Sequence, residues 1–174
     1  MITMTAQTLT GERADLLETL GTARHFLRHT VQGLTDEQAR LRSTASELTL
    51  GGLIKHVGEI ELGWARFVTE GPAAVAPPTE QAGWEKWTND FKMLPGETLE
   101  AILQRYSEIA AATDELVRTV DLDDSQELPP APWFQPGARR SARRVFMHIA
   151  AETAQHAGHA DIIRESIDGQ KTMG

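Results

Sequence analysis

Apolar residues recur in four long stretches of the chain with the 3.6-residue period of an amphipathic helix, and no stretch shows a convincing strand pattern. The four stretches run from about 11 to 31, 49 to 70, 97 to 120 and 138 to 168. Thr10 is a suitable N-cap for the first helix, and Gly169 is a suitable end for the last. Packing four such stripes together removes them from water, so the pattern predicts an all-α four-helix bundle, formed as a single domain over residues 1–174.

Two long proline-rich connections separate the last three of these helices. Residues 71–95 include Trp84 and Trp87, for which we expect a short helix, and residues 128–137 form the other connection. A short acidic segment, 36–40, is expected to add a turn or two of helix. The long connections between helices 2 and 3 and between helices 3 and 4 indicate a bundle without uniformly tight loops.

The composition argues against several classes of function. The chain has 25 Asp plus Glu against 17 Lys plus Arg, and its net charge of -8 repels phosphate backbones, so we expect no nucleic-acid partner. The absence of cysteine excludes a disulfide scaffold, a cysteine-ligated metal and a cysteine nucleophile. Because we find no signal peptide and no apolar run of roughly 18 residues, we expect a cytoplasmic protein without a membrane span.

Ionisable residues interrupt the apolar stripe of the fourth predicted helix. At about 100° per residue, His156 falls near the centre of the stripe and Glu152 about 40° away, still on the buried side. His159 and His148 fall about 60° and 80° away on the same flank. A carboxylate that faces a core is costly unless it is paired, neutralised or bound to a metal.

His56, at the margin of the apolar stripe of the second helix, can face the same point as Glu152 and His156. Nitrogen and carboxylate donors suit Zn²⁺, Ni²⁺, Fe²⁺ or Mn²⁺ and do not choose among them. Three protein ligands would leave one coordination position open for water or substrate. In the alternative interpretation the histidines are merely hydrogen-bonded, and Glu152 pairs with Arg66 or Lys55 of another helix.

Two segments of the chain resemble the DinB superfamily, in its actinobacterial branch. The segment LTLGGLIKHV at 48–57 resembles the second-helix segment of that family, and HIAAETAQHAGHADIIR at 148–164 resembles its fourth-helix signature. The resemblance covers nearly the whole chain. It implies a bundle of the DinB type with a divalent metal, most often zinc or nickel, held by His56, Glu152 and His156.

Many DinB-like proteins have histidine where this chain has Glu152, whereas the related mycothiol-dependent maleylpyruvate isomerases are similar to this chain in having glutamate. The resemblance therefore implies a thiol-dependent transferase or isomerase, in which the metal activates the thiol of a cofactor such as mycothiol toward an electrophilic substrate. It also implies a homodimer. A non-catalytic metal-binding or stress-response protein is the alternative function, and a structural dimer that has lost its metal is a further one.

Other residues are candidates for roles around the metal. His159 matches a position that is often glutamine in the family, and we expect it to orient a ligand or relay a proton. Arg140, Arg143 and Arg144, with Arg139 beside them, form a basic cluster expected to receive a carboxylate of the cofactor or substrate. The alternative is a solvated helix face that pairs with acidic neighbours.

Overall fold

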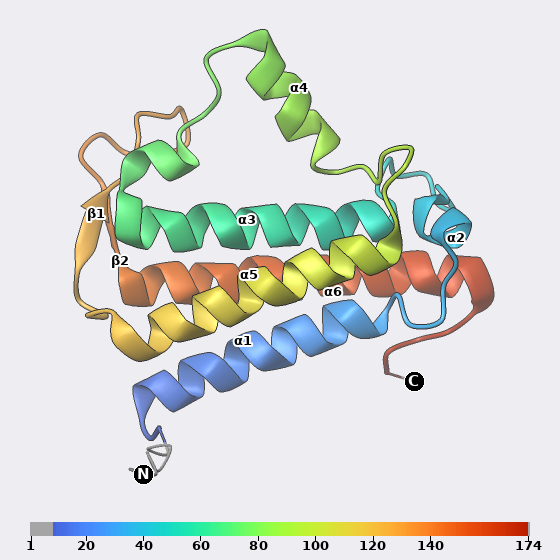
Figure 1. The fold of residues 1–174 in the computed structure, drawn as a ribbon, viewed down its shortest axis with the longest axis horizontal. Coiled ribbons are helices and arrows are strands. Elements are labelled where there is room, and N and C mark those ends of the chain that lie inside the picture. Colours follow the sequence, from blue (N-terminus) through green and yellow to red (C-terminus); the bar gives the residue numbers. More distant parts are fainter. Residues whose placement is uncertain (1–8, 174) are drawn as a thin grey trace, which may run out of the picture.

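The structure, a computed structural model, describes residues 9–173 and is mainly helical, which confirms the predicted fold class at that level. The helices are α1 (Glu12–His29), α2 (Asp36–Arg40), α3 (Leu50–Glu70), the 3₁₀ turn η1 (Pro72–Val75), α4 (Gln81–Asn89), α5 (Leu99–Thr119) and α6 (Ala142–Asp168). The four long helices α1, α3, α5 and α6 lie side by side, and α2 packs against α3 at one end (Figure 1). The ends of the predicted single domain, residues 1–8 and 174, lie outside the described residues.

The helix ends are set by local sequence. Four N-caps use a side-chain oxygen to accept a hydrogen bond from a backbone N–H that would otherwise be unpaired: Thr35, Thr49, Thr98 and Ser141. Gly169, with a φ of 78°, adopts the left-handed conformation and ends α6 as predicted. The predicted Thr10 cap is wrong, because α1 begins after Gly11, which makes no side-chain cap.

The last helix, predicted to begin at about residue 138, begins later, and the structure contains two short strands that the sequence did not predict. Residues 139–141 form the strand β2 (Arg139–Ser141), which pairs antiparallel with β1 (Ser125–Glu127), and α6 begins only at Ala142. Three residues are too few to show an alternating pattern in the sequence, so this small sheet was invisible there. It closes the connection between α5 and α6 at one end of the helices (Figure 1).

The apolar core consists of two clusters along the helices. Representative fully buried members are Leu27, Leu53, Leu50 and Ala160 in one cluster, and Phe67, Val117, Val145 and Phe146 in the other. Three polar residues on α1 and α3 are also buried: Arg24, His56 and Glu61. Among the described residues, no helix combines the length and the apolar character needed to cross a membrane.

Both long connections rise on one side of the helices, where α4 crosses over α3 (Figure 1). The predicted short helix around Trp84 and Trp87 is confirmed as α4, and none of its residues is buried. A contact between the Lys86 amine and the Glu59 carboxylate of α3, 3.7 Å apart, links α4 to the helices below. The side of the molecule under α4 is therefore covered by a lightly packed element.

Candidate functional site

Three residues on successive turns of α6 gather on the face toward α3. The Nε2 atoms of His148 and His156 lie 3.8 Å from opposite carboxylate oxygens of Glu152. All three side chains are half-buried. These distances exceed the length of a hydrogen bond, so the carboxylate lies between two imidazoles without being bound by either.

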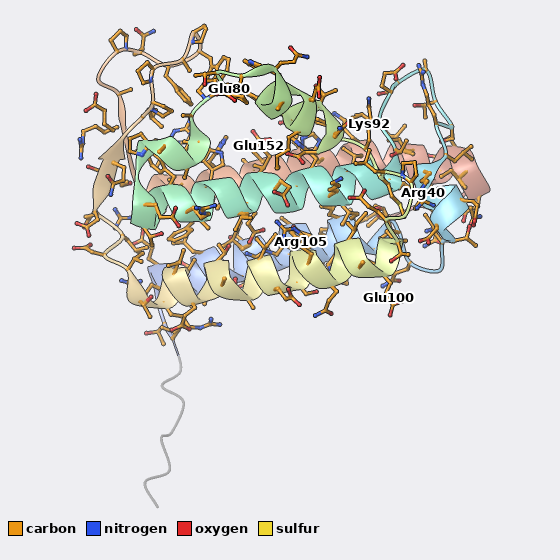
Figure 2. All side chains as sticks on the ribbon, turned by 45° about the horizontal axis from the view of Figure 1, so that its top comes forward. Arg40, Glu80, Lys92, Glu100, Arg105 and Glu152 are labelled. Atoms are coloured by element: carbon orange, nitrogen blue, oxygen red, sulfur yellow. The ribbon has the colours of Figure 1, made fainter. Side chains whose placement is uncertain are left out.

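His56 of α3 completes the group. Its side chain is buried, and its ring centre lies 5.0 Å from that of His156, with the two rings nearly perpendicular. Of the three residues predicted to hold a metal, the structure therefore places His156 next to both Glu152 and His56. Figure 2 shows Glu152 on the side of the helices from which α4 rises.

Phe91, just after α4, fixes the orientation of the His56 ring. The two rings are stacked with their centres 3.7 Å apart and their planes 20° from parallel. The first turn of α3 allows this approach, because a Cβ on Gly52 would collide with the carbonyl oxygen of Phe91. Sequence reasoning missed Phe91, although two consecutive glycines, Gly51 and Gly52, at the start of a helix are a signal of close backbone approach.

The imidazoles of the site are neutral near pH 7. Burial lowers the pKa of His56 to about 4, and the nearby His156 contributes in the same direction. Burial also lowers the pKa of His148 to about 4, together with the positive charges of Arg140 and Arg144. The pKa of His156 is lowered by burial and by His159. Since only an unprotonated imidazole nitrogen can bind a metal, these rings are in the form that a ligand requires.

His159 lies at the exposed edge of the group. Its Nδ1 is 3.4 Å from Nδ1 of His156, within hydrogen-bond reach when one of the two carries the proton. This contact engages the Nδ1 side of His156 and leaves Nε2 for the side facing Glu152. His159 is thus placed to orient His156, which is one of the two roles expected for it.

The structure separates the arginines that the sequence grouped together. Arg143 binds Glu12 and Asp123, as the alternative of pairing with acidic neighbours supposed, and Arg144 is exposed. Arg140 lies over the ring of Trp64, with its Cζ atom 4.6 Å from the ring centre. Arg139, the fourth arginine of the cluster, donates a hydrogen bond to the Ser125 hydroxyl across the small sheet.

Arg140 reaches the candidate site through Trp64. The ring of Trp64 meets that of His148 edge to face, with centres 4.8 Å apart. The Nη1 atom of Arg140 is buried and has no hydrogen-bond partner among residues 9–173. Of the basic cluster, Arg140 is the member whose position suits the binding of an acceptor group next to the site.

The alternative partners proposed for Glu152 are engaged elsewhere. The Lys55 amine lies 2.7 Å from Glu97, and the Arg66 guanidinium lies 2.8 Å from Glu70. Within the described part of the chain, no three His, Asp or Glu side chains are grouped closely enough to hold a metal ion. The donor types nevertheless fit a divalent ion: neutral imidazoles from two helices and a carboxylate that, among residues 9–173, forms no salt bridge with Lys or Arg.

Comparison with known proteins gives two results. A family model described as Mycothiol-S-transferase matches residues 15–169. A crystal structure of a conserved protein from Enterococcus faecalis superimposes with a TM-score of 0.67 at 14% sequence identity, covering 93% of this chain and 100% of that one. At this identity, the structural likeness shows the fold alone. No curated protein matches the chain.

Proposed function

The chain belongs to the mycothiol-S-transferase family, within the DinB superfamily, and from this premise we propose that it joins the sulfur of a mycothiol-type thiol to an electrophilic substrate at the site between α3 and α6. The observation that carries the proposal is the family match over residues 15–169. The group formed by His56, Glu152 and His156 supports the location of the chemistry.

The proposal assigns a divalent ion, zinc or nickel, to these three residues. When bound, such an ion lowers the pKa of a coordinated thiol enough to supply a thiolate at neutral pH. The two neutral imidazoles and the carboxylate would provide the donors, and three protein ligands would leave a position for the thiol. Since the chain has no cysteine, the reacting sulfur belongs to the cofactor.

The surrounding residues orient the reactants and move the proton. Phe91 holds the plane of His56 by stacking, and His159 holds Nδ1 of His156. The sulfur forms a bond to the electrophilic carbon, and the leaving group departs with its bonding electron pair. His159, at the exposed edge, is placed to accept the thiol proton and pass it to solvent. Arg140 is placed to bind an acceptor group of the cofactor or substrate.

The test is a conjugation assay with mycothiol and 1-chloro-2,4-dinitrobenzene, with the uncatalysed rate subtracted. We expect conjugation that depends on added Zn²⁺ or Ni²⁺ and is lost in the His156→Ala variant. His25→Ala is the matched control, because His25 is an exposed histidine on α1, away from the site. A metal-loaded parent that gives no conjugate would contradict the transferase and favour the non-catalytic metal-binding protein.

A further inference from the structure

Three tryptophans contact one another on the side of the helices from which α4 rises, and two of them are exposed. Trp84 is 44% exposed and Trp133 is 58% exposed, although tryptophan is ordinarily well buried. Trp84 and Trp87 of α4 stack on each other, with ring centres 5.0 Å apart and planes 7° from parallel. Trp133, from the connection between β1 and β2, meets Trp87 edge to face at 6.4 Å. Folding alone does not account for a solvent-facing aromatic group built from two separate connections.

This aromatic group continues inward to the candidate site. Trp133 contacts Phe134, with ring centres 6.1 Å apart, and the guanidinium of Arg140 lies 5.5 Å from the Phe134 ring centre. Arg140 also covers Trp64, which contacts His148. The side chains thus form an unbroken series of contacts from the surface to the face of α6 that carries Glu152. Figure 1 shows that α4 and the connection between β1 and β2 rise on the same side of the helices.

We propose that Trp84, Trp87 and Trp133, together with Arg140, form a subsite for a flat, electron-poor aromatic ring of the electrophilic substrate. Indole faces are electron-rich, and they stack favourably on rings depleted of electrons. The ring that the subsite holds belongs to a part of the electrophile away from the carbon that the sulfur attacks, because Phe134, Arg140 and Trp64 lie between the tryptophans and the site. The inference rests on the proposed function, because it names the substrate class of the same site.

Arg140 supplies a hydrogen-bond donor for a substituent of the ring, and α4 can move to make space for the ring. The buried Nη1 atom of Arg140, which has no partner within the described residues, can donate to a nitro or carboxylate substituent on the ring. Since α4 buries none of its residues, it can shift to accommodate a ligand at little cost in packing. The alternative is a flat surface that binds another protein. The contacts that lead from the tryptophans to Arg140 and His148 favour a subsite connected to the candidate site instead.

Binding is measured by calorimetry with 2,4-dinitrophenolate, an unreactive anionic ring, so that the result does not depend on catalysis. Trp133→Ala is expected to weaken binding about tenfold, and Trp133→Phe to restore most of it. Ile162→Ala is the control, because Ile162 is an apolar residue of α6 that is 65% exposed. Equal affinity of the parent and Trp133→Ala would overturn the subsite.

Kinetics and association state separate the remaining interpretations. With mycothiol as the thiol, Trp133→Ala should lower kcat/KM for an iodoacetamide that carries a dinitrophenyl group on a linker about tenfold relative to kcat/KM for iodoacetamide itself. Loss of self-association in Trp133→Ala, by sedimentation, would overturn the proposal in favour of a contact between two copies of the chain. Binding that depends on Trp133 without any conjugation would keep the subsite and reject only the transferase.

Discussion

Two groups of polar side chains that each include a residue of α3 differ in how their carboxylates are paired: Glu61 with Arg24, and Glu152 beside His56 and the histidines of α6. Glu61 is fully buried and accepts hydrogen bonds from Nε and Nη2 of Arg24, at 3.2 and 2.5 Å. The remaining Nη1 of Arg24 donates to Asp114 at 2.7 Å. Glu152, by contrast, lies 3.8 Å from the imidazoles on either side of it. The carboxylate of Glu61 is hydrogen-bonded to Arg24, whereas that of Glu152 has no hydrogen-bonded side-chain partner among residues 9–173.

The difference separates a group that maintains the fold from one that is available for chemistry. A buried charge is tolerated when its own chain supplies an opposite charge and hydrogen bonds, as Arg24 does for Glu61. Neutral imidazoles and a carboxylate that lie together without binding each other are donors that a cation can join. The two groups should therefore respond in opposite ways to mutation, one in stability and the other in ligand binding.

The largest expected effect is that of Arg24→Met. It leaves the fully buried Glu61 without its cation, which should lower the free energy of unfolding by about 3–5 kcal/mol. Urea denaturation measures the loss. The double variant Arg24→Met with Glu61→Leu should recover most of it, because no buried charge remains. A single variant as stable as the parent would show that the pair does not hold the helices together.

Gly52→Ala should affect both stability and the site. Its Cβ would collide with the carbonyl oxygen of Phe91, and such overpacking costs about 1–3 kcal/mol and displaces the ring that stacks on His56. Metal affinity, measured by calorimetry, should fall with it. In the control Gly158→Ala, the added Cβ of α6 meets nothing within 4 Å, and stability should rise by up to about 1 kcal/mol. Unchanged metal affinity in Gly52→Ala would remove Phe91 from the site.

Glu152→Gln should separate binding from stability. Because both neighbouring imidazoles lie beyond hydrogen-bond distance of this carboxylate, the free energy of unfolding should change by less than about 1 kcal/mol, while loss of the charge weakens metal affinity. Glu100→Gln is the matched control, an exposed carboxylate on α5 that Figure 2 labels. A large loss of stability with metal binding intact would place Glu152 in the same category as Glu61.

The smallest expected effect is that of His159→Ala. Loss of the contact with Nδ1 of His156 should lower metal affinity about tenfold, as for other residues that orient a metal ligand. Because His159 is exposed, the free energy of unfolding should stay within about 0.5 kcal/mol of the parent value. Complete loss of metal would instead make His159 a ligand.

The long helices and the proximity of the candidate residues could be predicted from the sequence, because the helical period places residues four apart on one face. That period put Glu152 and His156 together on α6, and the sequence also predicted that His56 faces them; the structure places its ring next to that of His156. Helix period says nothing about connections, so Phe91, which comes from one, could not be placed. The homodimer and the cytoplasmic location stay predictions.

The basic cluster shows a different limit of sequence reasoning. The side chains of neighbouring residues point in different directions where a strand ends and a helix begins. This change falls within the four arginines, because β2 ends at Ser141 and α6 begins at Ala142. Arg140 therefore turns to Trp64, whereas Arg143 turns to Glu12. No property of the sequence signalled this division.

Elemental analysis of the purified parent beside the His156→Ala and His25→Ala variants tests the central claim most directly. We predict about one zinc or nickel ion per chain in the parent and in His25→Ala, and none in His156→Ala, with the same helical circular dichroism in all three. A full complement of metal in His156→Ala, or a parent that takes up no metal when it is added, would contradict the assignment of the group on α3 and α6 as a metal centre.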